Sequence, residues 1–174
     1  MKQLEFLVED KIEEILSFIP PLVNEQGNEF KHYFSHGPSQ DLNSFIAKET
    51  EQNVYPLIWL VYPYTETRND INVTVSNLRL ILAVDNSVDM LNKQRLMGSY
   101  SKALYPLFFS IQKILTKANN IEVVDNEYRL TKFPNYGEKK HNHDTFDALT
   151  TTIWDALAVD FSFKLNKFCH KLKK

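Results

Sequence analysis

The segment from Tyr55 to Pro63, YPLIWLVYP, is the feature that most restricts how this chain can fold. It contains no charged and no amide side chain, and a proline lies near each end. Its short length and its β-branched and aromatic residues favour a β-strand that is buried on both faces over a turn of helix. Because proline has no N–H to donate, Pro56 and Pro63 are expected to mark where strand pairing begins and ends. The sequence therefore predicts a sheet with this strand in its interior.

A second strand is predicted over Val73–Val84, where apolar and polar residues alternate. The apolar positions are odd at first and even from Leu78 onward. Such a change of parity within one strand requires a bulge or a break, here near Ser76 and Asn77. The polar segment Tyr64–Asp70, YTETRND, is predicted to be a hairpin loop, so the two strands are expected to pair antiparallel.

Two helices are predicted in the first 50 residues. Residues 3–19 have apolar side chains at helical spacing and acidic side chains mostly on the other face, and Pro20 and Pro21 stop this helix. The apolar residues lose their period after Val23, so residues 23–40 are predicted to be a loop. A second, short helix is expected at about residues 41–50.

The strongest periodic pattern covers Asn92–Ala118 and predicts one long helix. A kink or a restart is expected at Tyr105-Pro106, because proline interrupts the hydrogen bonds of a helix. Asn119 and Asn120 are expected to close the helix in the left-handed conformation, which asparagine tolerates.

Two strands and a charged loop are predicted near the C-terminus. Tyr128–Phe133 reads as a short strand, and Pro134–Thr145 is a charged loop. Apolar residues alternate with small or polar ones over Leu157–Leu165, which predicts a strand with one face in the core and the other in water. The sequence has no internal repeat, and its 174 residues suit one domain.

The charge of the chain is nearly balanced, with 20 basic and 22 acidic residues and a formal net charge of -2. No overall positive field is therefore available to attract nucleic acid through its phosphates. Basic residues gather locally at the C-terminus, where a solvated tail is the preferred interpretation over a partner-binding segment. This group consists of Lys164, Lys167, Lys171, Lys173 and Lys174 with His170.

The place of synthesis is predicted from the cysteine content and from two apolar patterns. Cys169 is the only cysteine, which excludes an intramolecular disulfide and agrees with a reducing cytoplasm. The N-terminus, MKQLEFLVEDKIEEIL, is acidic and lacks the basic region and the unbroken apolar run of a signal peptide. No stretch reaches the roughly eighteen apolar residues that span a bilayer. The protein is therefore expected to be made in the cytoplasm and to have no membrane contact.

Histidines supply the main candidate metal ligands. His141 and His143 with Asp144 form an H-x-H pattern that projects two imidazoles to one side of an extended chain. His32 and His36 have the i, i+4 spacing that places two ligands on one face of a helix, but no helix is otherwise predicted there. Solvated loop histidines are the preferred interpretation of both pairs.

Other candidate chemistry is weaker still. Cys169 lies beside His170, which could lower the pKa of the thiol, but no third orienting group is evident. The four glycines are isolated and form no phosphate-binding loop. A surplus of Tyr and Trp at strand edges would suit a protein–protein contact surface. Four carboxylates near the C-terminus are interpreted as solvated or helix-capping groups rather than as an acid and base pair: Asp144, Asp147, Asp155 and Asp160.

The predicted order of elements is a helix, two paired strands, a long helix, a short strand and an alternating C-terminal strand. Together with four stretches of sequence, this order resembles the small neck and tail-completion proteins of tailed bacteriophages, especially the tail-terminator-like group in phages of Bacteroidetes hosts. The resemblance covers roughly residues 55–168. The stretches are YPLIWLVYP, LILAV, NKQRLMGSYSKALYPLFFSIQKIL and DALTTTIWDALAVDFSFKLN.

The resemblance implies an α+β fold, with a mostly antiparallel sheet and helices packed on one face, including one long helix. A single domain is expected over residues 1–174. Within it, residues 1–50 are expected to form an N-terminal helical arm or extension, residues 51–168 the α+β core, and residues 169–174 a basic tail. No catalytic, cofactor-binding or metal-binding residue is implied, and the protein is expected not to be an enzyme.

The implied function is that of a structural virion protein. Copies would form a ring at the head–tail junction, act there as a connector or tail terminator, and close the joint of the DNA channel. The expected partners are further copies and neighbouring portal, connector or tail proteins, with passive contact to DNA in the channel. The loops YTETRND and PNYGEKKHNHD are expected to touch neighbours or to line the channel.

Two other interpretations stay open. One is a small metal-dependent enzyme that uses His141, His143 and a carboxylate such as Asp144. The other is a regulatory binding module that uses the basic C-terminus.

Overall fold

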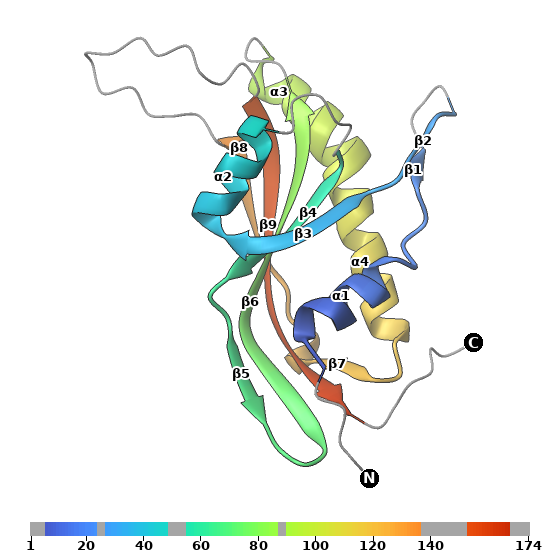
Figure 1. The fold of residues 1–174 in the computed structure, drawn as a ribbon. Coiled ribbons are helices and arrows are strands. Elements are labelled where there is room, and N and C mark those ends of the chain that lie inside the picture. Colours follow the sequence, from blue (N-terminus) through green and yellow to red (C-terminus); the bar gives the residue numbers. More distant parts are fainter. Residues whose placement is uncertain (1–5, 24–26, 49–54, 87–89, 137–152, 168–174) are drawn as a thin grey trace.

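A computed structural model describes residues 6–23, 27–48, 55–86, 90–136 and 153–167. Within these ranges the chain forms a seven-stranded sheet, a separate two-stranded ribbon and several helices (Figure 1). The elements in chain order are α1 (Val8–Leu16), β1 (Leu22–Val23), β2 (Glu29–Phe30), β3 (Tyr33–Pro38), α2 (Ser39–Lys48), β4 (Leu57–Tyr62), β5 (Thr65–Arg68), β6 (Asn72–Asn86), α3 (Asn92–Arg95), the π-helix η1 (Leu96–Leu104), α4 (Tyr105–Lys117), β7 (Ile121–Val123), the short 3-10 helix η2 (Val124–Asn126), β8 (Arg129–Tyr136) and β9 (Ile153–Asn166).

The sheet is built around β6 and β9, two long strands that pair antiparallel along almost their whole length. β4 pairs antiparallel with the Arg79–Ala83 part of β6, as predicted, and all four residues from Leu57 to Leu60 are buried. β5 pairs with the first part of β6, while β7 and β8 pair with β9. The predicted α+β class, with a mostly antiparallel sheet and one long helix, is therefore confirmed.

The predicted irregularity in β6 is confirmed as a β-bulge. The register of β6 against β9 shifts between Val75 and Leu78, and Asn77 has the left-handed φ of 58°. Because of this shift, the odd-numbered Val73 and Val75 and the even-numbered Leu80 point into the same core. The bulge therefore keeps both halves of a strand with mixed parity on one buried face.

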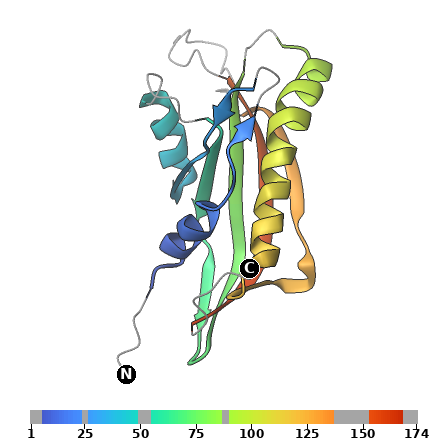
Figure 2. The same cartoon turned by 90° about the vertical axis from the view of Figure 1, so that its right-hand side faces the viewer.

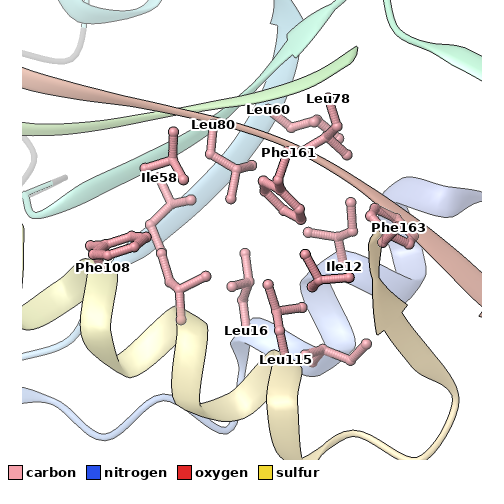
Figure 3. Close-up of a cluster of buried hydrophobic side chains, with 14 of the residues drawn as sticks. Ile12, Leu16, Ile58, Leu60, Leu78, Leu80, Phe108, Leu115, Phe161 and Phe163 are labelled. Atoms are coloured by element: carbon pink, nitrogen blue, oxygen red, sulfur yellow. The ribbon is translucent and has the colours of Figure 1, made fainter. Parts of the chain in front are cut away.

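The larger core lies between one face of the sheet and two helices, α1 and α4. Figure 3 shows side chains from β4, β6 and β9 meeting those of α1 and α4. The long helix and α1 lie along this side of the sheet (Figure 2). The residues labelled in the close-up are all buried: Ile12, Leu16, Ile58, Leu60, Leu78, Leu80, Phe108, Leu115, Phe161 and Phe163.

A second, smaller core covers the opposite face of the sheet. Leu42 and Phe45 of α2 pack there against Trp59 and its neighbours on β4, β6 and β9. α1 and the long helix thus share one face of the sheet. α2 lies on the other face, which differs from the expectation that the helices pack on one face. The prediction that one side of the last strand stays in water is wrong for its first half, since Ala156 and Ala158 are buried in this second core.

The prediction of a loop over residues 23–40 is also wrong, because this region contains β3, the only parallel neighbour of β4 in the described sheet. The strand has the sequence YFSHGP. Glycine and proline are rare in strands, so their presence here obscured the strand pattern in the sequence. Gly37 is needed there, since a Cβ at this position would lie 3.1 Å from the Trp59 ring. The Trp59 indole N–H donates to the Gly37 carbonyl at 3.0 Å.

The first helix is shorter than predicted, and residues 1–5 lie outside the described ranges. Even so, Val8, Ile12, Ile15 and Leu16 of α1 are buried in the larger core. The described part of the first 50 residues therefore contributes a helix, a strand of the sheet and the cover of its second face. The predicted short helix at about 41–50 is present as α2.

The segment Tyr64–Asp70 is not a simple loop. Its middle forms β5, which pairs with β6, so the turn is confined to the residues between Arg68 and Asn72. The β5–β6 hairpin forms one end of the molecule (Figure 1), and β6 stays paired with β9 as far as Asn72.

The long helix runs without interruption through α3, η1 and α4, which confirms its prediction. The change from π-helix to α-helix falls at Tyr105, where Pro106 lacks an N–H and a restart was expected. The predicted left-handed closure at Asn119 and Asn120 is wrong. Ala118 is already extended, with a ψ of 125°, and neither Asn119 nor Asn120 has a positive φ before β7 begins at Ile121.

Candidate functional site

Most of the residues that the sequence singled out for chemistry lie outside the described ranges. His141, His143, Asp144 and Asp147 fall within 137–152, and the segment from Cys169 to the C-terminus falls within 168–174. The metal, thiol and basic-tail interpretations of these residues therefore stay predictions. So does most of the charged loop predicted over Pro134–Thr145.

The other histidine pair does not lie on a helix. His32 precedes β3 and His36 is within it, so the i, i+4 spacing falls on extended chain. Burial lowers the pKa of His32, with a further contribution from the charge of Lys31. Within the part of the chain that the structure describes, no group of three or more His, Cys, Asp or Glu side chains could hold a metal ion.

A hydrogen-bonded network joins α1 to the strands around β4. The hydroxyl of Tyr62 donates to the Glu9 carboxylate at 2.7 Å, and the hydroxyl of Tyr64 donates to the same carboxylate oxygen. The Tyr62 oxygen also lies 2.8 Å from Nδ1 of His36. Because the Tyr62 proton is used toward Glu9, the tautomer of His36 that fits is the one in which Nδ1–H donates to Tyr62.

The network has a defined charge. Burial alone would raise the pKa of Glu9, but the hydrogen bonds from Tyr64 and Tyr62 outweigh it and hold the pKa below the ordinary value of 4.5. Burial, and then the bond to Glu9, raise the pKa of both tyrosines. The carboxylate is therefore ionised and both phenols are neutral at physiological pH, which makes this network a fixed link between α1 and the sheet.

A buried ion pair anchors the start of the long helix. Arg95 and Asp155 are 2% and 0% exposed, and Nη1 of Arg95 lies 2.8 Å from Oδ1 of Asp155. The Arg95 Nε–H donates to the Met90 carbonyl at 2.9 Å. The Asn86 amide donates to the other oxygen of Asp155 and, at 3.0 Å, to the Ser99 hydroxyl. The interpretation of Asp155 as a solvated or capping residue is therefore wrong.

Asp160 belongs to a different, exposed site beside the β-bulge. Its two carboxylate oxygens accept bonds of 2.6 and 3.0 Å from the Arg79 guanidinium, a pairing across β6 and β9. A polar pocket of about 220 Å³ opens next to this pair. It is lined by Asn77, Val124, Asp125, Glu127, Arg129, Asp160, Phe161 and Ser162. Asp155 and Asp160 thus do not act together, in agreement with the sequence interpretation.

Large apolar side chains are exposed at both ends of the molecule. Leu91, Leu96 and Met97 at the start of the long helix are 70%, 47% and 62% exposed. Ile71, in the turn of the β5–β6 hairpin at the opposite end, is 56% exposed (Figure 1). Leu7, Phe18, Val23, Tyr33 and Phe109 are also exposed. Individual exposed apolar residues are common, but groups of them mark contact surfaces.

The Glu9 network and the buried ion pair were missed by sequence reasoning. Tyr62 and Tyr64 flank a proline at the end of a predicted strand. Their spacing of two residues was the only sign in the sequence that both side chains point to the same side. Their acceptor lies more than fifty positions away in the sequence. Asp155 is one of several similar carboxylates, and only the folded chain places Arg95 opposite it.

Comparison with known proteins adds no relative. No protein-family model matches the chain, and a search of curated proteins found no match. Among the described residues, no helix combines the length and the apolar character needed to cross a bilayer.

Proposed function

We propose that this protein is a structural component of a tailed-phage virion, a ring-forming connector or tail-terminator-like subunit at the head–tail junction. In this role it closes the joint of the DNA channel between portal and tail. Support comes from the α+β fold that the sequence resemblance implied and from the distribution of exposed apolar side chains. The protein is assembled from the host cytoplasm into the particle.

The observation that carries the proposal is the pair of apolar ends. A subunit placed between two other rings needs a contact surface at each end of its long axis. Leu91, Leu96 and Met97 form an exposed apolar group at one end, and the single exposed Ile71 lies in the hairpin turn at the other. Exposed apolar groups of this kind are typical of surfaces that become buried in an assembly.

The hairpin turn is held rigidly, which suits a docking element. The Asn69 side chain accepts hydrogen bonds from the backbone N–H groups of Ile71 and Asn72, at 2.9 and 2.7 Å. Lys167 donates through its side chain to the Asn69 carbonyl, and through its backbone N–H to the Ile71 carbonyl at 2.9 Å. A preorganised turn loses little entropy on binding, so it presents Ile71 at low cost.

The proposal is tested by locating the protein in particles and by measuring its mass. Antibody labelling of tailed particles produced from the genome that encodes this chain should place it at the neck. Light scattering after size-exclusion chromatography, with electron microscopy of the purified full chain, should show a closed ring. Label elsewhere, or absence of the chain from particles together with a single-chain mass at every concentration, would overturn the proposal.

A further inference from the structure

The charges of the two helical elements on the larger core are strongly unequal. The long helix over residues 92–117 contains five basic and no acidic residues, and four of these cations remain when the buried Arg95, which is paired with Asp155, is set aside. In α1, four acidic residues and one basic residue give −3. The whole chain has a formal net charge of only -2. Opposite charge is therefore separated onto neighbouring parts of one side of the molecule (Figure 2).

The basic charge of α4 lies on its outer stripe. Phe109, Lys113 and Lys117 are spaced four residues apart and are all exposed, with Phe109 at 58%. The opposite stripe of the same helix, with Leu107, Ile111 and Leu115, is buried against the sheet. The outer stripe therefore combines two cations with one large aromatic side chain.

The outer face of α1 has the complementary composition. Asp10 and Glu13 are exposed, and Phe18, just beyond the end of the helix, is 54% exposed. Glu14 is already paired with Lys11 at 2.6 Å. In the described part of the chain, no salt bridge involves Asp10, Glu13, Lys113 or Lys117. The two faces are thus complementary in charge but do not neutralise each other within one chain.

We propose that the acidic outer face of α1 in one copy of this protein binds the basic outer face of α4 in a second copy. The inference rests on the proposed ring function and names the contact between adjacent subunits. Each copy offers both faces on one side of the molecule, so a second copy that approaches this side can meet the acidic face with its own basic face. A second copy matches the basic face in charge and also brings an exposed phenylalanine to the side of Phe109.

The two kinds of side chain have separate roles in this contact. Exposed ion pairs are individually weak and screened by salt, so Asp10, Glu13, Lys113 and Lys117 set the orientation and the rate of encounter. The affinity comes mainly from burial of Phe18 and Phe109 at the centre. Association should therefore weaken as salt is raised, without being abolished.

The test uses charge reversal on each face of the full chain. Asp10→Lys with Glu13→Lys, and Lys113→Glu with Lys117→Glu, should each weaken self-association at least about tenfold, because each variant then presents two faces of like charge. An equimolar mixture of the two variants, or one chain that carries all four changes, should restore association. The matched control is Glu29→Lys with Glu127→Lys, which changes the net charge by the same amount as the first variant but lies off both helices. Thermal unfolding confirms that each variant is folded.

The outcomes separate this inference from the proposed function. If both variants form rings as the wild type does, the α1–α4 contact is wrong and the ring function stands. If the variants lose association but the mixture does not regain it, the pairing of these two faces is wrong. If Lys113→Glu with Lys117→Glu abolishes binding to DNA or to anionic vesicles and leaves self-association intact, the basic face serves a different partner. A wild-type chain that never self-associates overturns the α1–α4 contact, and labelling of particles then decides the proposed function separately.

Discussion

Glu9 shows how one residue joins distant parts of this chain. Its carboxylate accepts hydrogen bonds from Tyr62 and Tyr64. These two tyrosines come after β3 and α2 in the sequence. The α1 helix is held to the sheet partly by apolar burial and partly by this ionised group. The first contribution is independent of pH, and the second is not.

The Glu9→Gln substitution should remove part of the acid sensitivity of the fold. The pKa of Glu9 is lowered in the folded chain, so its contribution to stability is fully present above the ordinary pKa of 4.5 and is lost as the pH falls through the folded value. The wild type should therefore be more stable than the variant at pH 7, and the difference should vanish in acid. Urea unfolding at a series of pH values measures this. An equal difference at every pH would mean that the charge of Glu9 is irrelevant.

Removing one partner of the buried ion pair should cost much more than removing one partner of the exposed pair. Asp155→Ala removes the buried carboxylate that faces the Arg95 guanidinium in the core, which should lower the free energy of unfolding by about 3–5 kcal/mol. Asp160→Ala removes an exposed partner of Arg79, and its cost should be about 0–1 kcal/mol. Chemical denaturation of the two variants provides the comparison. Similar losses in both would show that Asp155 is not isolated from water.

At the scale of single elements, the sequence was most informative where one pattern extended over a whole element. The long helix, β6 and β9 are predicted from a helical or alternating period of apolar residues, and β4 from an unbroken apolar run between two prolines. Even the bulge near Asn77 was predicted, since a change of parity allows no other regular pairing. β3 was missed because it contains glycine and proline and depends on a contact between Gly37 and Trp59 that is not local in sequence.

Substitutions at Asn77 should report the left-handed backbone of the bulge. The φ of 58° is accessible to glycine, tolerated by asparagine and unfavourable for other residues. Asn77→Gly should therefore change stability by less than about 0.5 kcal/mol, whereas Asn77→Ala should cost about 1 kcal/mol. The midpoints of thermal unfolding give both values. A stabilising alanine would mean that the bulge relaxes into a regular strand.

At the scale of the whole molecule, the sheet is covered by helices on both faces, and large apolar side chains are exposed at both of its ends. The sequence predicted the class and the main pairings, but it did not predict how surfaces far apart in the chain combine. The Glu9 network and the Arg95–Asp155 pair depend on tertiary placement. No periodic pattern in the chain encodes such groupings.

The Ile71→Asp substitution should separate folding from assembly. Ile71 is exposed in a turn, so the charge should change the free energy of unfolding by no more than about 0.5 kcal/mol. Burial of an unpaired carboxylate at a ring interface is costly, so incorporation into particles should fall sharply. Thermal unfolding and quantification of the chain in purified particles measure the two effects. Ile71→Val serves as the control and should assemble normally.

The pairing of β6 with β9 has a mechanical consequence. The fifteen residues of β6 span about 50 Å, from the hairpin turn to the residues that precede the long helix. A force applied along this axis would load the ladder in shear, so that many hydrogen bonds share the strain at once and none breaks alone. In the proposed particle, which holds compressed DNA, the β6–β9 pair would therefore resist extension between the two ends of the molecule.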